Sequence, residues 1–197
     1  MKGTISNKPD IALSPGVYEA DLLEVEAWRA DKYQQEGTEV ILNFVWELED
    51  DNEEMVQNND NFIRLTQGPD GMPTLNERSK LYNRLAALYG QKIDTESDNV
   101  EWEIVFPRQY NSVEGLLDLP HYNDRKDEQP VLVKSIIIND GDEEVELIGG
   151  TAQVNIIEKG QYFNVESATA RARKKKSKKV RDIEPIAADE GTTALPV

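Results

Sequence analysis

The stretch "TEVILNFVWELED" (38–50) carries the clearest strand signal in the chain. Apolar side chains recur at every second position, which is typical of a strand that buries one face. The face that this pattern predicts to lie in the core carries Val40, Leu42, Phe44, Trp46 and Leu48. The opposite face, which we expect to be open, carries Glu39, Ile41, Asn43, Val45 and Glu47.

Two more strand patterns flank this one. The segment "SPGVYEADLLEVEAWRA" (14–30) alternates as a strand does, and its phase shifts after Leu23, which predicts a β-bulge. The segment "NFIRLTQ" (61–67) predicts a third strand. The acidic stretch "EDDNEEMVQNND" (49–60), which precedes it, is predicted to be a turn or loop.

A helix is predicted within residues 68–93. Thr74 or Asn76 can cap its start, and Gly90 stands where a helix end favours a left-handed residue. Leucines at helical spacing form its apolar side, at Leu81, Leu85 and Leu88. Its basic residues are expected on a solvated face, at Arg78, Lys80 and Arg84.

Two hairpins are predicted near the end of the domain. The first joins 131–140 to 143–148 across Asp-Gly, and the second spans 150–170 with a turn at 158–160. The first lies at the end of a segment, about 94–146, that we interpret as an insertion. Three strands, a helix and closing strands (β-β-β-α-β-β) predict a mainly β fold with one helix, in the form of an OB-fold-like barrel. A generic α+β sandwich has the same element order and stays open as an alternative.

The domain organisation follows from these elements. Residues 1–14 are expected to be a flexible lead-in, and 15–170 to form the OB-like domain with its insertion. Residues 171–197 show no apolar periodicity and predict a disordered tail, first basic and then mildly acidic.

Four stretches of the chain carry a resemblance to a known group. They are "LSPGVYEADLLEVE", "EVILNFVWELED", "RSKLYNRLAALYGQKI" and "LIGGTAQVNIIEKGQYFNVESATA". Together they resemble phage and prophage proteins of the OB-fold single-stranded-DNA-binding type, which serve as replication or recombination accessory proteins. The resemblance covers about 13–93 and 147–170. It implies binding to single-stranded DNA in replication, recombination or repair, in the cytoplasm of a bacterial host cell.

The charge of the chain is unevenly distributed. The sequence has 22 basic and 38 acidic residues, for a formal charge of −16. Eight of the basic residues fall within one short segment, the basic run: Arg171, Arg173, Lys174, Lys175, Lys176, Lys178, Lys179 and Arg181. The acidic remainder repels nucleic acid at long range, whereas the basic run binds polyanions through counterion release. Alternatively, the basic run contacts the protein's own acidic body and masks the site.

The third strand supplies the best candidate for a binding surface. Ile63 and Leu65 are predicted to point inward, which leaves Phe62 and Arg64 outward. An aromatic ring stacks on a base and a guanidinium pairs with phosphate, as in proteins that bind single strands. Further candidates for contact with nucleic acid are Asn43, Lys32, Tyr33, Lys159, Tyr162 and the basic run. As simpler alternatives, Phe62 packs under the insertion and Tyr162 closes the barrel.

Catalytic motifs are scarce in this sequence. There is no cysteine, and the one histidine, His121, lies in a predicted loop without a second ligand at metal-binding spacing. No Gly-rich phosphate loop is present, and no apolar run approaches a membrane span of about 18 residues. We therefore expect a non-enzymatic protein without cofactor, metal or membrane partner.

Two functions remain as hypotheses. The first is single-stranded-DNA binding, with replication or recombination proteins recruited by the C-terminal tail. The second is an acidic protein–protein adaptor, virion-associated module or DNA-mimic inhibitor with a basic tether, because a strongly acidic body suits a basic partner.

Overall fold

The structure is a computed structural model that describes residues 13–32, 37–69, 71–95, 97, 99–141, 143–160 and 162–171. The predictions made for residues 1–12, for Tyr33 and for the basic run and tail beyond Arg171 lie outside these residues.

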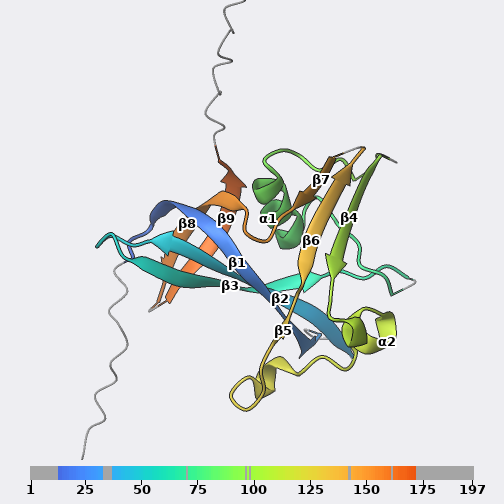
Figure 1. The fold of residues 1–197 in the computed structure, drawn as a ribbon. Coiled ribbons are helices and arrows are strands. Elements are labelled where there is room, and N and C mark those ends of the chain that lie inside the picture. The colour runs from blue at the N-terminus through green and yellow to red at the C-terminus, as the bar shows by residue number, and fades with distance from the viewer. Residues whose placement is uncertain are drawn as a thin grey trace, which may run out of the picture.

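Over the described residues the protein is mainly β with one helix longer than a single turn, as the sequence predicted. Its elements in chain order are β1 (Gly16–Asp31), β2 (Thr38–Glu49), β3 (Met55–Leu65), α1 (Lys80–Tyr89), β4 (Val100–Val105), η1 (Arg108–Tyr110), α2 (Val113–Leu116), η2 (Tyr122–Asp124), β5 (Val131–Leu132), β6 (Ser135–Asp140), β7 (Glu143–Glu146), β8 (Thr151–Lys159) and β9 (Tyr162–Ala170). The larger sheet has the order β3-β2-β1-β8-β9, with β5 added beside β1. The smaller sheet has the order β4-β6-β7, and all ladders between named strands are antiparallel (Figure 1).

The long strand β1 organises the larger sheet. It pairs with β2 along most of its length, while its first part pairs with β8 and Glu26 and Ala27 pair with β5. The predicted bulge is confirmed, because the register with β2 shifts between Leu22 and Glu24. The bulge changes which alternate residues face inward, so that Leu22 and Val25 are both buried.

Both faces of β2 are buried. The predicted core face is confirmed, since Leu42, Phe44 and Trp46 have no exposed surface. The expectation of an open opposite face is wrong, because Ile41, Asn43 and Val45 are at most 3% exposed. On this same face Trp28, a neighbour of Ile41 in the ladder, is covered by the ring of Tyr122 from the insertion.

Strand β3 starts six residues earlier than predicted. The acidic stretch expected to be a loop already forms ladder pairs with β2 from Met55 onward. Its inward-facing residues there are polar, Asn58 and Asp60, at 7% and 2% exposure. Because polar residues at these positions break the apolar alternation, the sequence pattern did not predict that this face of the strand is buried.

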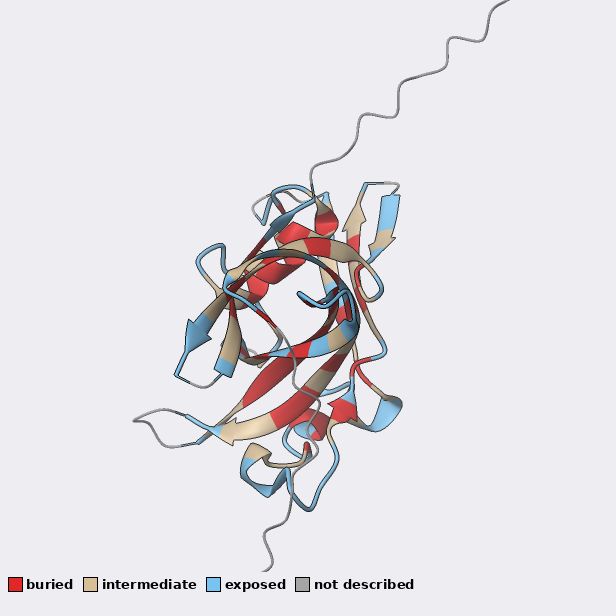
Figure 2. Ribbon diagram, turned by 90° about the vertical axis from the view of Figure 1, so that its left-hand side faces the viewer, coloured by how far each residue is buried: buried red, intermediate tan, exposed pale blue. Residues whose placement is uncertain are grey.

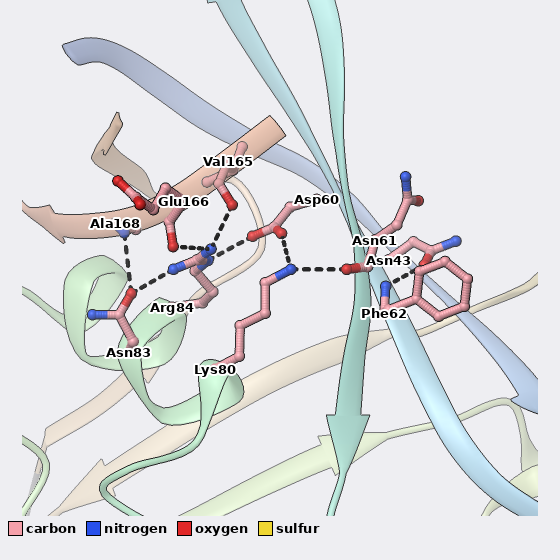
Figure 3. Close-up of polar contacts among 10 residues, drawn as sticks. All are labelled: Asn43, Asp60, Asn61, Phe62, Lys80, Asn83, Arg84, Val165, Glu166 and Ala168. Carbon is pink, nitrogen blue, oxygen red and sulfur yellow. Dashed lines mark hydrogen bonds and ion pairs between the residues drawn. The ribbon is translucent and has the colours of Figure 1, made fainter. Parts of the chain in front are cut away.

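A buried guanidinium explains that polar face. Arg84 of α1 has 1% of its surface exposed, and its Nε donates to Asp60 Oδ2 at 2.5 Å (Figure 3). Its Nη2 donates to the Val165 carbonyl of β9 at 3.1 Å, so one side chain joins both edge strands of the larger sheet. Lys80 Nζ forms an ion pair with Asp60 Oδ1 at 2.5 Å. The prediction of a solvated Arg84 is therefore wrong, because its charge is matched inside the fold.

The helix itself follows the predicted pattern at its end and departs from it at its start. Gly90 closes it in the left-handed conformation with φ 84°, as expected, and Leu81 and Leu85 are buried. The N-cap is Ser79, whose hydroxyl accepts from the Tyr82 N–H at 3.0 Å, and not Thr74 or Asn76.

The edge strands β3 and β9 approach each other as the larger sheet curls (Figure 2). Within the described residues no backbone ladder joins them, and the sheet path ends at these two strands. Besides Arg84, a weak side-chain bond links them, from Asn58 Nδ2 to the Phe163 carbonyl at 3.4 Å. A fully hydrogen-bonded closed barrel is therefore not present in the described part of the chain.

The insertion adds the smaller sheet to the same core. The predicted hairpin near its end is confirmed as β6 and β7, and the closing hairpin as β8 and β9. Buried residues of the smaller sheet, such as Ile104, Ile136 and Ile138, belong to one continuous cluster with Leu85 of α1. None of the helices in the described ranges is long and apolar enough to cross a membrane.

We expect Arg84→Met to lower the free energy of unfolding by about 3–5 kcal/mol, because it leaves Asp60 buried without its main partner. Urea denaturation measures this loss. The matched control is Arg78→Met on an exposed position before the same helix, which should cost about 0.5 kcal/mol or less. The double variant Asp60→Leu/Arg84→Met removes both charges and should be more stable than Arg84→Met alone. Equal losses for Arg84→Met and Arg78→Met would contradict the role assigned to Arg84.

Candidate nucleic-acid interface

Phe62 lies at a second bulge, between β2 and β3. Leu42 pairs with Ile63 and Phe44 with Asp60, so Asn43 alone stands opposite Asn61 and Phe62. Phe62 adopts φ 59°, a left-handed conformation that is uncommon for a bulky residue. The predicted orientation is confirmed. Ile63 is buried, whereas Phe62 is 56% exposed.

Asn43 holds this bulge in place. Its Oδ1 accepts a hydrogen bond from the Phe62 N–H at 3.2 Å (Figure 3), and its Nδ2 donates to Glu26 Oε2 at 3.2 Å. With 3% exposure, Asn43 has no open surface to offer a ligand. The sequence placed it in the site as a contact residue, and the structure shows it supporting the backbone of Phe62 instead.

Tyr122, which the sequence did not suggest, packs against Phe62. The two ring centroids are 4.7 Å apart at an interplanar angle of 64°, an edge-to-face contact. Tyr122 also meets Trp28 edge-to-face at 5.8 Å, and the Arg125 guanidinium lies 4.5 Å from its ring centroid. We call Trp28, Phe62 and Tyr122 the aromatic cluster. The simpler alternative, that Phe62 packs under the insertion, is met only in part, because the ring contacts Tyr122 but stays 56% exposed.

A groove of about 560 Å³ opens beside Phe62. It is lined by Ala30, Asp31, Lys32, Glu39, Ile41, Phe62 and Arg64. Two of the predicted contact residues, Lys32 and Arg64, therefore meet Phe62 here. Arg64 Nε pairs with Glu39 Oε1 at 3.1 Å, and its side chain remains 61% exposed. The groove thus carries two positive and two negative side chains, beside one exposed aromatic ring.

The insertion is fastened to the end of β1 beside this groove. The Arg29 N–H donates to the Pro120 carbonyl at 2.9 Å, and Arg29 Nη1 donates to the Leu117 carbonyl at 2.5 Å. His121 Nε2 lies 3.2 Å from Asp31 Oδ1, and its Nδ1 accepts from the Asn123 N–H at 3.2 Å. The single histidine therefore joins η2 to β1. Over the described ranges, no group of three or more histidine or acidic side chains is placed to hold a metal ion.

The remaining candidates lie elsewhere. Lys159 and Tyr162 are exposed at the β8–β9 turn and do not line the groove. The neighbouring Phe163 contacts Asn58, which is several residues along β3 from Phe62. Arg171, the one described member of the basic run, pairs through Nε with Glu19 Oε2 at 2.9 Å.

Comparisons of the chain with protein-family models, curated proteins and solved structures found no match. A function must therefore be inferred from the residues of the groove and the aromatic cluster.

We expect Phe62→Gly to be more stable than Phe62→Ala by about 1 kcal/mol, because glycine adopts the left-handed conformation without steric cost. Thermal or urea denaturation of the two variants measures the difference. The control is the same pair of changes at Arg64, two residues along the strand, where glycine should be the less stable by about 0.5–1 kcal/mol. If glycine is also the less stable residue at position 62, the left-handed backbone is not held there in solution.

Proposed function

We propose that this protein binds single-stranded DNA without catalysis, in the groove beside Phe62. The observation that carries the proposal is an exposed aromatic ring, fixed in an uncommon backbone conformation by Asn43, next to the exposed guanidinium of Arg64. Stacking on an aromatic face suits any unpaired base, and the guanidinium pairs with the phosphate backbone. A duplex, whose bases are already stacked, gains little from such a ring.

The strand order supports an OB-type barrel as the scaffold. The sheet order β3-β2-β1-β8-β9 and the place of α1 between β3 and β8 along the chain agree with that fold. Contacts from Asn58 to Phe163 and, through Arg84, from Asp60 to Val165 indicate that the two edge strands run in the same direction. We propose a barrel closed at this seam by side chains. OB-folds bind across their second and third strands and the loop after the first. The groove lies there.

The distribution of charge along the chain supports different roles for the groove and for the C-terminal tail. Residues 1–170 hold 14 basic and 34 acidic residues, yet the charges that line the groove balance. The groove therefore does not share the net negative charge of the body. Its balanced charges do not attract a nucleic-acid strand over a long distance. The basic run, tethered just after β9, raises the local concentration of a strand near the groove. We propose that this binding serves replication, recombination or repair, in line with the resemblance to phage proteins.

One observation favours the alternative of an acidic adaptor or DNA mimic. Exposed glutamates stand in two rows on one face of the smaller sheet: Glu101 and Glu144 flank Asn139, and Glu103 and Glu146 flank Ile137. Strand geometry spaces the backbone positions of these glutamates by about 7 Å along a strand and about 10 Å across it. The Glu146 carboxylate also accepts hydrogen bonds from the Ile136 and Ile148 N–H groups. Such a regular negative surface is complementary to a basic partner.

The binding of fluorescent oligo-dT and of a duplex across a salt series tests the proposal. We compare the intact chain with Phe62→Ala and with a full-length variant in which Lys174, Lys175, Lys176, Lys178 and Lys179 are glutamine. We expect preference for the single strand in both the intact chain and the tail variant. Phe62→Ala should bind about 5- to 150-fold more weakly, the loss of one stacked base. Absence of binding by the intact chain at low salt would overturn the proposal and favour the adaptor.

A further inference from the structure

We infer that the insertion extends the strand-binding surface beyond the groove, with Tyr122 and Arg125 contacting the nucleotide next to the one on Phe62. This inference rests on the proposed function. It assigns a binding role to a segment of the chain, 117–125, for which the sequence suggested none.

The first support is the continuity of the aromatic surface. The ring of Tyr122 is half-buried and lies edge-to-face on Phe62, so the two rings extend one surface from β3 onto η2. A second ring beside the first gives a second base of the same strand a place to stack, since neighbouring bases follow each other along the backbone. Trp28, beneath Tyr122 at 4% exposure, supports the ring from inside.

The second support is a positive charge that lies over the Tyr122 ring. Arg125 is exposed, and its guanidinium lies 4.5 Å from the Tyr122 ring centroid while its Nη1 donates to the Tyr122 carbonyl at 3.1 Å. A guanidinium has five donors, so several remain for a phosphate. The same turn carries Asp124 and Asp127, whose negative charges repel a nucleic-acid strand. Because the guanidinium lies over the ring, we expect a base to stack on the Tyr122–Arg125 pair, which supplies most of the affinity, and Arg125 also to supply one phosphate contact.

The third support is that hydrogen bonds fix the segment in place before any ligand binds. Arg29 bonds to the carbonyls of Leu117 and Pro120, and His121 joins Asp31, so 117–122 is fixed to the end of β1 that lines the groove. A site already fixed before binding loses little conformational entropy when the ligand arrives.

Photo-crosslinking of the full-length chain to oligo-dT carrying 5-iododeoxyuridine tests the contact directly. We expect mass spectrometry to find crosslinked peptides containing Phe62 and Tyr122. Crosslinks at Phe62 without any at Tyr122 would overturn this inference and leave the proposed function standing. Absence of crosslinks at both rings, together with no binding of oligo-dT, would overturn the proposed function itself.

Matched variants of the full-length chain separate binding from folding. Tyr122→Leu keeps an apolar side chain and should weaken oligo-dT binding roughly 5- to 100-fold, by the loss of one stacked base. Its control, Tyr110→Leu, removes a tyrosine of η1 that lines a different pocket, and this variant should bind as the intact chain does. Thermal unfolding of both variants checks that the fold is kept. Equal binding by the two variants would contradict the inference.

The salt dependence tests Arg125. Arg125→Gln should reduce the slope of log affinity against log salt by about 0.7, the value for one phosphate contact on a single strand. Arg108→Gln removes the same charge from an exposed position of the insertion outside the groove, and should leave the slope unchanged. Identical slopes for Arg125→Gln and the intact chain would show that Arg125 makes no phosphate contact.

Discussion

The guanidinium of Arg84 connects three elements, the helix α1 and the two edge strands of the larger sheet. It meets the carboxylate of Asp60 on β3 and the Val165 carbonyl on β9, while its own backbone belongs to α1. A backbone ladder between the two strands is not found in the described residues, and these side-chain bonds link β3 to β9 in its place. Burying an ion pair costs desolvation, and both partners must stay together to offset it. The arrangement therefore fixes one orientation of the helix against the sheet edges.

The polar seam also determines where Phe62 points. Before the bulge, Asn58 and Asp60 face inward toward Arg84, and after it Ile63 and Leu65 face inward to the apolar core. The bulge at Asn61 and Phe62 permits this change, because one extra residue reverses the alternation of faces. Phe62 is consequently turned outward in a left-handed conformation with its N–H bound to Asn43. The outward direction of this candidate binding residue therefore follows from the change of inward-facing side chains along β3, from polar before the bulge to apolar after it.

The insertion converts a single exposed ring into a larger surface. It covers Trp28 with Tyr122 and places the Arg125 guanidinium over the Tyr122 ring, and it is joined to β1 through Arg29 and His121. Its smaller sheet presents exposed glutamates. The two proposed functions therefore concern different faces of the same chain: a groove with balanced charge and a strongly acidic sheet.

The sequence alone determined the features that depend on local periodicity. The core face of β2, the bulge in β1, the closing glycine of α1, both hairpins and the outward direction of Phe62 and Arg64 are all present. Each of these is set by residues within a few positions of one another, where alternation and turn chemistry act.

Only the tertiary structure decided the rest. The early start of β3, the burial of Arg84, the internal bonds of Asn43 and the meeting of Tyr122 with Phe62 each depend on a partner far away in the chain. Asp60 and Arg84 look like solvated charges in the sequence, because each is polar in a locally polar stretch. Their burial becomes favourable only when the fold brings opposite charges into contact. A local sequence pattern cannot predict this contact, because the two residues are far apart in the chain.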